Sequence, residues 1–258
     1  MSQKIPLNIV KIGGNVIDDS NKLQQFLKDF SALPEKKILV HGGGKIATKF
    51  ASQMGIEAVM IDGRRVTDPE MLKIVTMVYG GLVNKNIVSQ LQALGTNAIG
   101  LGGMDGQIIL SKKREPNPID FGLVGDIVAV QHTTIQKLLD AELSPVLAPL
   151  TSDKEGQILN TNADTIAQSI AVALAKNFEV KLTYCFEKKG VLADPENEES
   201  VIAHINKDSY KNYKETGVIS GGMIPKLDNA FQALNDGVNT VRICSSEELN
   251  SNSGTIIQ

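Results

Sequence analysis

The sequence predicts an α/β fold with a mainly parallel central sheet. Strand-like and helix-like segments alternate along the whole chain, and two of the predicted strands end directly in glycine clusters. Alternating units of this kind place their strands in a parallel sheet that helices cover. The 258 residues suffice for one large domain or two closely packed lobes, and neither a linker nor a low-complexity segment interrupts them.

Strands are predicted from short runs that are rich in β-branched and other apolar residues. The first run spans residues 5–12 and the second spans residues 37–40. Residues 57–66 have the pattern of a hairpin with Asp62-Gly63 at its turn. Further strands are expected at 97–101, 107–111, 126–130, 145–150, 180–186 and 239–244.

Helices are predicted where apolar residues recur at intervals of three and four. Asp19 is a capping candidate for the first helix, Pro69 opens another, and Gly237 ends the last long one. A further helix is expected over 134–141, and 194–200 is expected to be an acidic loop. The apolar faces comprise Leu23, Phe26, Leu27 and Phe30; Ile46, Ala47, Phe50, Ala51 and Met54; Ala163, Ile166, Ala167, Ile170, Ala171 and Leu174; and Met223, Leu227, Ala230, Phe231 and Leu234.

Composition argues against several classes of protein. Hydrophobic residues make up 42% and charged residues 21%, which is close to the globular norm. The net charge is −3, whereas a general nucleic-acid binder carries a basic surplus. The chain has no run of about 18 apolar residues and no signal-peptide layout at its start. We therefore expect a cytoplasmic chain that binds neither nucleic acid nor a membrane.

The cysteines and histidines point to structural roles. Cys185 and Cys244 lie in apolar strand-like runs and are expected to be buried free thiols in a reducing compartment. His41 stands at a strand end beside glycines and is expected to be a structural donor rather than a base. Because there is no HExxH motif and no Cys/His cluster, we expect no protein-bound metal.

Two glycine clusters suggest an anion site. Lys11-Ile12-Gly13-Gly14-Asn15 follows the first strand, and His41-Gly42-Gly43-Gly44-Lys45 follows the second. Glycines let backbone N–H groups approach an anion closely, and the second cluster also opens a helix, whose N-terminus is partly positive. The pair predicts a phosphate, or a developing anion, held between two strand ends. Tight turns alone would also explain each cluster taken singly.

The established phosphate and hydrolase motifs are absent. Gly44-Lys45 is followed by Ile46 rather than Ser or Thr, so the second cluster is not a Walker A loop. The chain has no correctly spaced dinucleotide fingerprint, no protein-kinase catalytic loop and no GxSxG nucleophile turn.

Three further motifs contain candidate site residues. Arg65, at the hairpin end, could clamp a carboxylate or lie in solvent. Asn162 and Asp164 suit the cap and first turn of a helix, but capping does not explain Asn160. Lys226 lies at a helix start, where its charge is unfavourable unless an anion is near, although it could also be a plain surface lysine.

These five motifs, in this order, resemble those of the amino-acid-kinase family over essentially the whole chain. Each motif alone is weak, whereas the ordered set is specific. Carbamate, uridylate, aspartate and glutamate 5-kinases share the glycine turns. The Arg-Val-Thr hairpin end and the Asn-x-Asn-Ala-Asp run are similar to the branch that acts on N-acyl-glutamate. The resemblance implies a three-layer α/β sandwich with a mainly parallel central sheet, the carbamate-kinase-like fold.

The resemblance also implies two lobes that share one continuous sheet. Residues 1–175 would bind the acyl-glutamate and form the dimer, and residues 176–258 would bind ATP. The arginine-inhibited, hexameric members carry an extra N-terminal helix, whereas only four residues precede Ile5 here. We therefore expect an arginine-insensitive homodimer.

The implied reaction is ATP-dependent phosphorylation of the γ-carboxylate of an N-acyl-L-glutamate, namely N-acetyl-L-glutamate in arginine biosynthesis. A carboxylate with a pKa of about 4.3 is already ionised at neutral pH, so no general base is needed. The protein must instead supply positioning and charge stabilisation for the transfer. Mg²⁺ would arrive with ATP, bound mostly by nucleotide oxygens and water.

The resemblance assigns the roles of individual residues. Lys11 and Lys226 would neutralise the migrating phosphoryl group from opposite sides, and Asp164 would orient both by ion pairing. Arg65 would bind the substrate's α-carboxylate, assisted by Asn160 and the backbone of Gly43 and Gly44. Backbone N–H groups for the phosphoryl oxygens would come from Gly13, Gly14 and Gly44. Nucleotide contacts would come from Glu187, Lys188, Lys189, Gly190, Val191, Leu192, Val218, Ile219 and Ser220.

Several positions depart from the family pattern and leave the acceptor open. The turn at 186–190 reads Phe-Glu-Lys-Lys-Gly where a Ser-Asp-Val type is usual. Lys45 and Arg64 add charge beside the acyl pocket, which raises the hypothesis that N-succinyl-L-glutamate is the acceptor, unless Arg64 points into solvent. The sequence is also compatible with a carbamate or nucleotide acceptor, with an ATP-binding sensor that transfers nothing and, more distantly, with a nucleotide-dependent oxidoreductase.

Overall fold

Eight strands form the central sheet, in the order β12-β14-β13-β11-β1-β2-β8-β5. The computed structural model describes residues 4–61 and 63–258. Within them β13 and β14 run antiparallel, and the other neighbouring pairs of this sheet run parallel. The strands are β1 (Ile5–Ile12), β2 (Lys36–His41), β5 (Ala98–Leu101), β8 (Ser144–Leu147), β11 (Phe178–Phe186), β12 (His204–Ile205), β13 (Thr240–Ser245) and β14 (Thr255–Ile257).

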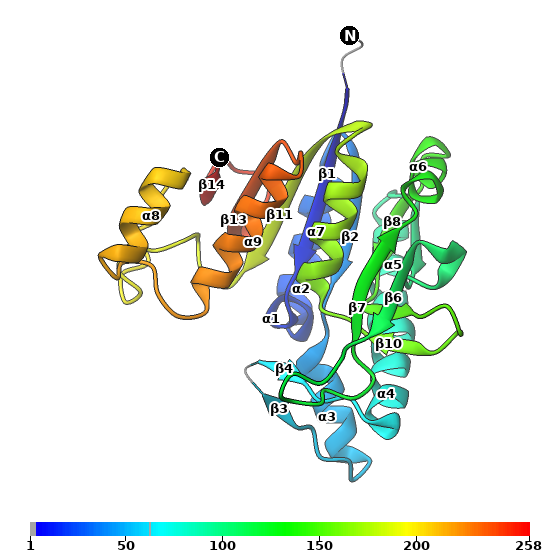
Figure 1. The fold of residues 1–258 in the computed structure, drawn as a ribbon. Coiled ribbons are helices and arrows are strands. Elements are labelled where there is room, and N and C mark those ends of the chain that lie inside the picture. Colours follow the sequence, from blue (N-terminus) through cyan, green and yellow to red (C-terminus); the bar gives the residue numbers. More distant parts are fainter. Residues whose placement is uncertain (1–3, 62) are drawn as a thin grey trace.

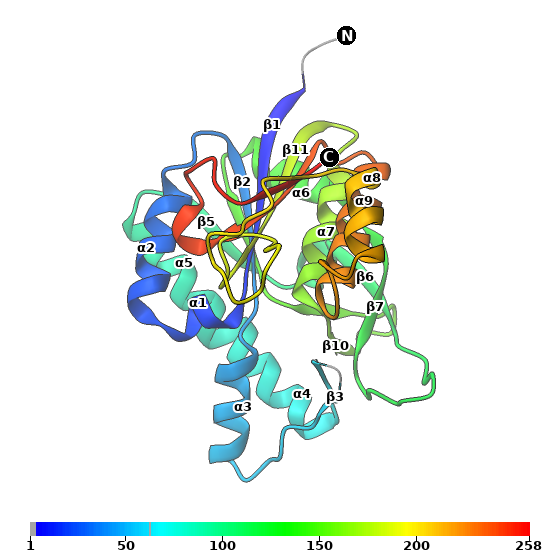
Figure 2. The ribbon, with the colours of Figure 1, turned by 90° about the vertical axis from the view of Figure 1, so that its left-hand side faces the viewer.

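Helices cover both faces of this sheet, which gives the molecule three layers (Figure 1). Figure 2 shows α1, α2 and α5 on one side of β1, and α7, α8 and α9 on the other. The helices are α1 (Gly14–Asp18), α2 (Ser20–Ser31), α3 (Gly44–Gln53), α4 (Pro69–Val75), α5 (Asn84–Ala93), α6 (His132–Asp140), α7 (Ala163–Leu174), α8 (Lys207–Glu215) and α9 (Met223–Asn235). A π-helical stretch, η1 (Thr76–Val83), joins α4 to α5, and short 3₁₀ turns lie at η2 (Asp105–Gln107) and η3 (Ser246–Glu248).

Side-chain alternation along β1 divides the core into two parts. Leu7 and Ile9 belong to the cluster that includes α7 and α9, whereas Val10 and Ile12 belong to the cluster that includes α2 and α5. Successive strand side chains point to opposite faces, so Lys11 shares the face of Leu7 and Ile9. The strand therefore presents Lys11 to α7 at the carboxyl end of the sheet.

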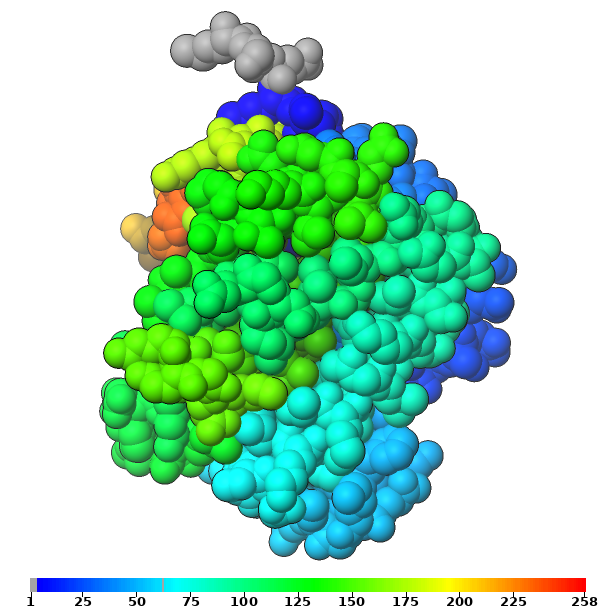
Figure 3. Space-filling model, turned by 90° about the vertical axis from the view of Figure 1, so that its right-hand side faces the viewer, coloured from blue at the N-terminus to red at the C-terminus, as the bar shows by residue number. Residues whose placement is uncertain are grey.

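Two smaller sheets extend the molecule beyond the central one. A four-stranded sheet has the order β10-β9-β6-β7, and β3 and β4 form a two-stranded hairpin. Figure 3 shows the molecule from the right-hand side of Figure 1, and the surface there consists mainly of the middle of the chain, coloured cyan to green. The strands are β3 (Met60–Ile61), β4 (Arg64–Arg65), β6 (Ile109–Lys113), β7 (Gly125–Val130), β9 (Leu150–Ser152) and β10 (Ile158–Asn160).

The predicted fold class is confirmed, and so are most of the long elements. The Asp19 carboxylate accepts hydrogen bonds from two backbone N–H groups at the start of α2, and the side-chain oxygen of Asn162 caps α7 by accepting one from Thr165. Pro69 opens α4, and the predicted apolar face of α2 is buried. Among the described residues, no helix has the length and apolar character needed to cross a membrane.

Several element predictions are wrong. The expected strand at 107–111 begins at Ile109, because residues 105–107 form a 3₁₀ turn. The expected strand at 145–150 is divided between β8 and β9, which belong to different sheets. On α3, Phe50 and Met54 are exposed, so the predicted apolar face is only partly buried. The hairpin at 57–66 is present, but Asp62 of its predicted turn lies outside the described residues.

Candidate active site

A cavity of about 540 Å³ opens at the carboxyl ends of β1 and β11, between the helical layers. One part of its lining comes from the two glycine turns, the start of α3 and the hairpin. The other part comes from the turn after β11 and the first turn of α9. The lining residues include Gly13, Gly14, Gly44, Lys45, Thr48, Arg65, Phe186, Glu187, Lys188, Gly190 and Lys226.

Lys11 and Asp164 form an ion pair beside this cavity. The Lys11 Nζ lies 2.8 Å from Asp164 Oδ1, and only 10% of the lysine side chain is exposed. Both residues are placed by local structure, because Lys11 faces α7 from β1 and Asp164 lies in the first turn of α7. Asn162 fixes the start of that helix by accepting a hydrogen bond from the N–H of Thr165 at 3.0 Å.

The Lys226 side chain, from the start of α9, lies close to Lys11 at the Phe186 ring. Its Nζ lies 3.9 Å from the centroid of the Phe186 ring, and the Lys11 Nζ lies 5.4 Å from that centroid. Burial lowers the pKa of Lys226, and the charge of Lys11 adds to this effect, whereas Asp164 and Glu187 oppose it. Two ammonium groups from distant parts of the chain therefore lie close to one aromatic ring.

The two glycine turns pack against each other next to these amines. The N–H of Gly42 donates to the carbonyl of Ile12 at 3.1 Å. A Cβ at Gly13 would lie 3.9 Å from Lys11 Nζ, so this backbone is close to the lysine amine. Gly43 has a φ of +149°, and a Cβ there would lie 3.0 Å from Tyr79 Cδ1, which explains the need for glycine.

Arg65 also lines the cavity. Its Nη2 donates to the carbonyl of Gly44 and to Thr48 Oγ1, each at 2.8 Å, and the residue is only 7% exposed. No carboxylate among the described residues lies within ion-pair distance of this guanidinium. A buried positive charge without a protein counter-ion favours an anionic ligand. The neighbouring Arg64 is exposed and does not line the cavity.

Asn160 supports the site from outside the cavity lining. It ends β10, and its Nδ2 donates to Thr67 Oγ1 at 3.0 Å. Thr67 is fully buried and follows Arg65 by two residues. Asn160 thus connects the start of α7 with the hairpin end, and its predicted contact with substrate stays a prediction.

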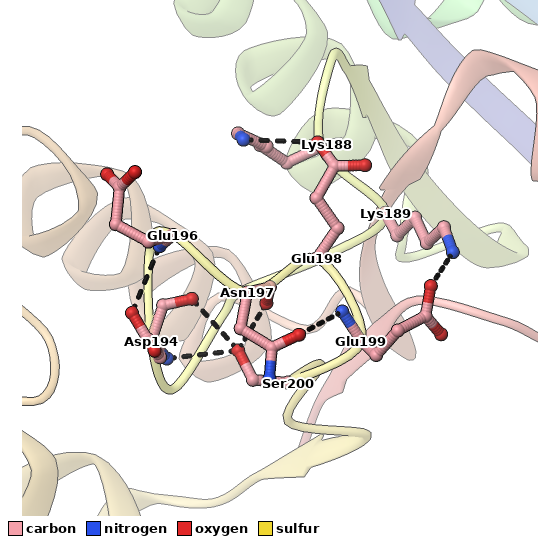
Figure 4. Close-up of polar contacts among 8 residues, drawn as sticks. All are labelled: Lys188, Lys189, Asp194, Glu196, Asn197, Glu198, Glu199 and Ser200. Carbon is pink, nitrogen blue, oxygen red and sulfur yellow. Dashed lines mark hydrogen bonds and ion pairs between the residues drawn. The ribbon is translucent and has the colours of Figure 1, made fainter.

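The turn after β11 is held by an acidic loop. Glu187, Lys188 and Gly190 line the cavity, and Lys188 Nζ lies 3.1 Å from Glu198 Oε1. Lys189 Nζ is paired with Glu199 Oε1 at 2.5 Å, and the Glu199 carboxylate raises the pKa of Lys189. Figure 4 shows both lysines reaching across to the loop at 194–200, which Ser200 closes through hydrogen bonds to Asp194 and Asn197.

Six of the nine residues expected to contact nucleotide lie outside the cavity lining, and one of them is Lys189. The Val191 side chain is buried, and its N–H donates to Thr255 Oγ1 at 2.8 Å. Leu192 forms an isolated bridge with Val201. The remaining three, Val218, Ile219 and Ser220, precede α9, and Ile219 is buried.

His41 is a neutral structural residue. Its Nδ1 lies 2.7 Å from the carbonyl of Gly42, and its Nε2 lies 3.1 Å from Asn84 Nδ2. The Nδ2 group of Asn84 can only donate, so Nε2 of His41 accepts and its Nδ1 donates. Complete burial lowers the pKa of His41 to about 4. The two cysteines, Cys185 and Cys244, are buried free thiols that face each other across β11 and β13.

Sequence reasoning missed the roles of Phe186, Tyr79 and Thr48. Phe186 was recognisable only as a departure in the turn after β11. The contact of Tyr79 with Gly43 depends on how η1 packs against the second glycine turn, and no local pattern reveals that packing. Thr48 lies one turn after Gly44 in α3, and this spacing could have indicated that it faces the same cavity.

The fold and this site define a phosphoryl-transfer protein of the amino-acid-kinase type. The profile of the amino acid kinase family matches residues 6–245, and the chain belongs to this family. An acetylglutamate kinase of Cytophaga hutchinsonii is 58% identical over 244 residues, which cover 94% of this chain and 92% of that protein. An acetylglutamate kinase of Parabacteroides distasonis is 54% identical over 249 residues, which cover 96% and 98%.

A solved structure supports the same fold. The crystal structure of smu.665 from Streptococcus mutans UA159 has a TM-score of 0.80 and 29% sequence identity to this chain. The match covers 98% of each chain.

Proposed function

We propose that this chain transfers the γ-phosphoryl group of ATP to the γ-carboxylate of N-acetyl-L-glutamate. The observation that carries the proposal is the meeting of Lys11 and Lys226 beside the glycine turns, with Arg65 in the same cavity. The relatives named acetylglutamate kinase support this acceptor. The product would be an acyl phosphate, an activated intermediate of arginine biosynthesis.

The acceptor would lie between Arg65 and the glycine turns. The guanidinium would bind the α-carboxylate, because it is buried, charged and fixed by Gly44 and Thr48. The γ-carboxylate would then point toward Gly13, Gly14 and Lys11. ATP would enter from the side of Glu187, Lys188 and Lys226, with its γ-phosphate between the two lysines.

The transfer needs charge stabilisation rather than proton removal. A γ-carboxylate oxygen attacks the γ-phosphorus, the bond to the β–γ bridging oxygen breaks, and ADP leaves with the negative charge. Lys11 and Lys226 neutralise the phosphoryl oxygens during this step, together with the N–H groups of the glycine turns. Asp164 holds Lys11 in place without taking up a proton from the substrate.

Magnesium fits this site as part of the nucleotide substrate. Among the described residues that line the cavity, Glu187 is the single carboxylate. Asp164 is already paired with Lys11. A divalent cation would therefore take most of its ligands from phosphate oxygens and water.

Lobe assignment and assembly remain proposals. We assign acceptor binding to residues 1–175 and nucleotide binding to residues 176–258, because the first part supplies Arg65 and the glycine turns to the cavity lining, and the second supplies the turn after β11 and Lys226. The central sheet runs through both parts. A homodimer in the cytoplasm is the assembly that the family resemblance favours.

A second acceptor, N-succinyl-L-glutamate, is favoured by one observation. Lys45 lines the cavity and its Nζ donates to Asn15 Oδ1, and from there it could meet a second carboxylate on the acyl group. Arg64 is exposed and does not line the cavity, so it gives no support. Acetyl-glutamate therefore remains the primary proposal.

The proposal is tested by a panel of acceptors with MgATP and hydroxylamine. Hydroxylamine traps an acyl phosphate as a hydroxamate, and ADP release is followed in parallel. We expect hydroxamate with N-acetyl-L-glutamate, and no ADP release above background with carbamate or uridylate. A clear preference for the succinyl compound would support the second acceptor. ADP release without hydroxamate from any acceptor would refute acyl-phosphate formation.

A further inference from the structure

Phe186 stands at the end of β11 on the face that α7 and α9 cover. It shares this face with Leu182 and Tyr184, because alternate residues of a strand point the same way. Its ring stacks on Tyr184, with centroids 6.2 Å apart and an interplanar angle of 15°. Tyr184 is buried and paired in register with Lys11 of β1. Tyr184 therefore supports the Phe186 ring, and Phe186 also lines the cavity.

Both amines of the site lie close to this ring. The Lys226 Nζ is 3.9 Å from the ring centroid, which is close contact for a cation over an aromatic face. The Lys11 Nζ is 5.4 Å away, still within the range of the same attraction. The two like charges share one ring, and Lys11 is held in addition by its ion pair with Asp164.

The charges around Lys226 leave it without an ion-pair partner. Asp164 contacts Lys11 at 2.8 Å, and among the described residues no carboxylate lies within 4.0 Å of Lys226 Nζ. Asp164 and Glu187 attract the amine from a greater distance, whereas Lys11 repels it. Tyr184, which lines the small cavity beside it, remains a neutral phenol because burial raises its pKa.

We propose that Phe186 is a positioning residue, whose ring holds the Lys226 ammonium at the transfer point before the phosphate arrives. This inference rests on the proposed phosphoryl transfer. A ring suits the task because its π face attracts a cation but carries no net negative charge. A carboxylate at this position would hold Lys226 more firmly, but it would repel the incoming phosphate and compete with it for the amine.

The most direct test is an NMR titration of Lys226 in the nucleotide-free protein, with its signal assigned from Lys226→Met. The π face favours the charged amine, so removing it lowers the pKa of Lys226. Phe186→Leu keeps most of the volume without the π face, and we expect it to lower this pKa by about 0.5 to 1 pH unit. Phe186→Tyr keeps the π face and is expected to leave the pKa where it is.

A matched control exists elsewhere in the chain. The Lys37 Nζ lies 5.6 Å from the Phe30 ring centroid, and both residues are far from the cavity lining. Phe30→Leu removes a buried ring next to a lysine in the same way, and we expect no change in the titration of Lys226. An unchanged or raised Lys226 pKa in Phe186→Leu, or the same fall in Phe30→Leu, would overturn the inference.

Kinetics give a second readout. Phe186→Leu should lower kcat by roughly 10-fold with little change in KM for the acceptor, because the ring acts on Lys226 rather than on the acceptor. Phe186→Tyr should retain most of kcat. If Phe186→Leu does not fold in a thermal melt, Phe186→Met replaces it, since a thioether also fills the space without a π face. Equal kcat values for the leucine and tyrosine variants would contradict the inference.

The two proposals fail separately. The titration needs no substrate, so it decides on Phe186 even if the acceptor is wrong. Conversely, wild-type protein that forms no hydroxamate would refute the proposed function whatever the titration gives.

Discussion

At the scale of single residues, Asp164 supplies the negative charge that faces the two candidate catalytic lysines, Lys11 and Lys226. It pairs directly with Lys11 and attracts Lys226 from farther away. Two ammonium groups and one carboxylate leave a local positive excess. On a chain of net charge −3, this excess is what would draw a nucleotide phosphate into the cavity.

Asp164→Asn should lower kcat by about 10- to 100-fold, because Lys11 loses its partner and leaves the position beside the glycine turns. Turnover is measured by hydroxamate formation at saturating substrates. Asp126→Asn is the control, since Asp126 forms an ion pair with Arg114, at 2.6 Å, and neither residue lines the cavity. A similar loss in both variants would show that the effect is general destabilisation.

Arg65 and Arg64 provide a second comparison between neighbouring residues. Arg65→Ala should raise KM for the acceptor by about 10- to 100-fold, because one charge-assisted carboxylate contact is lost. Arg64→Ala should leave this KM nearly unchanged, because Arg64 is exposed and off the cavity. Initial rates at varied acceptor concentration decide the point, and a larger effect at Arg64 would overturn the assignment of the acceptor site.

At the scale of elements, the parallel register of β1 with β11 brings the site together. Lys11 is paired with Tyr184, so Phe186 lies two residues further along the neighbouring strand, on the same face. The first turns of α7 and α9 then supply Asp164 and Lys226 over that face. The register of the two strands therefore brings residues that are distant in sequence into one cluster.

The loop at 194–200 is the element that we expect to compete with nucleotide for Lys188. Glu198 pairs with Lys188, which lines the cavity, whereas Glu199 pairs with Lys189, which does not line it. Glu198→Gln should lower KM for MgATP by about two- to five-fold, because an exposed pair of this kind is weak and its loss frees Lys188. Glu199→Gln is the control. A raised KM for MgATP in Glu198→Gln would show that the pair helps binding instead.

The elements that sequence could predict are those with a strong local signal. The strand before the first glycine turn, the cap of α7 and the start of α4 all follow from short patterns. The structure adds α8, whose residues are mostly polar, and β12 and β14, which are two and three residues long and depend on distant partners. Lys11, Asp164 and Lys226 were predictable as an ordered motif set, whereas the contact of both amines with Phe186 depends on tertiary packing.

At the scale of the whole molecule, buried polar contacts link the sheet to its helices. His41 ends β2, Asn84 begins α5, and the Asn84 amide also donates to the carbonyl of Val146 in β8 at 2.9 Å. These three elements are thereby tied together beneath the second glycine turn. The arrangement requires a neutral imidazole, because one ring nitrogen must accept.

Stability should therefore fall in acid through His41. Its pKa is about 4 in the folded state, against 6.5 for the ordinary group, so the unfolded chain binds the proton first. This contribution is complete above pH 6.5 and is lost as the pH falls toward 4, by about 2 kcal/mol between pH 7.5 and pH 5. Urea unfolding of His41→Gln should show a flatter pH dependence than wild type. His204→Gln, at an exposed site, should behave like wild type.

In the proposed mechanism, the ammonium groups of Lys11 and Lys226 both contact the phosphoryl group during its transfer. It is tested most directly by a crystal structure of the protein with MgADP, tetrafluoroaluminate and N-acetyl-L-glutamate. We expect Lys11 Nζ and Lys226 Nζ each to lie about 2.7 to 3.2 Å from fluorine atoms of the planar group, on opposite sides of it. A structure in which either amine points away from that group would contradict the account.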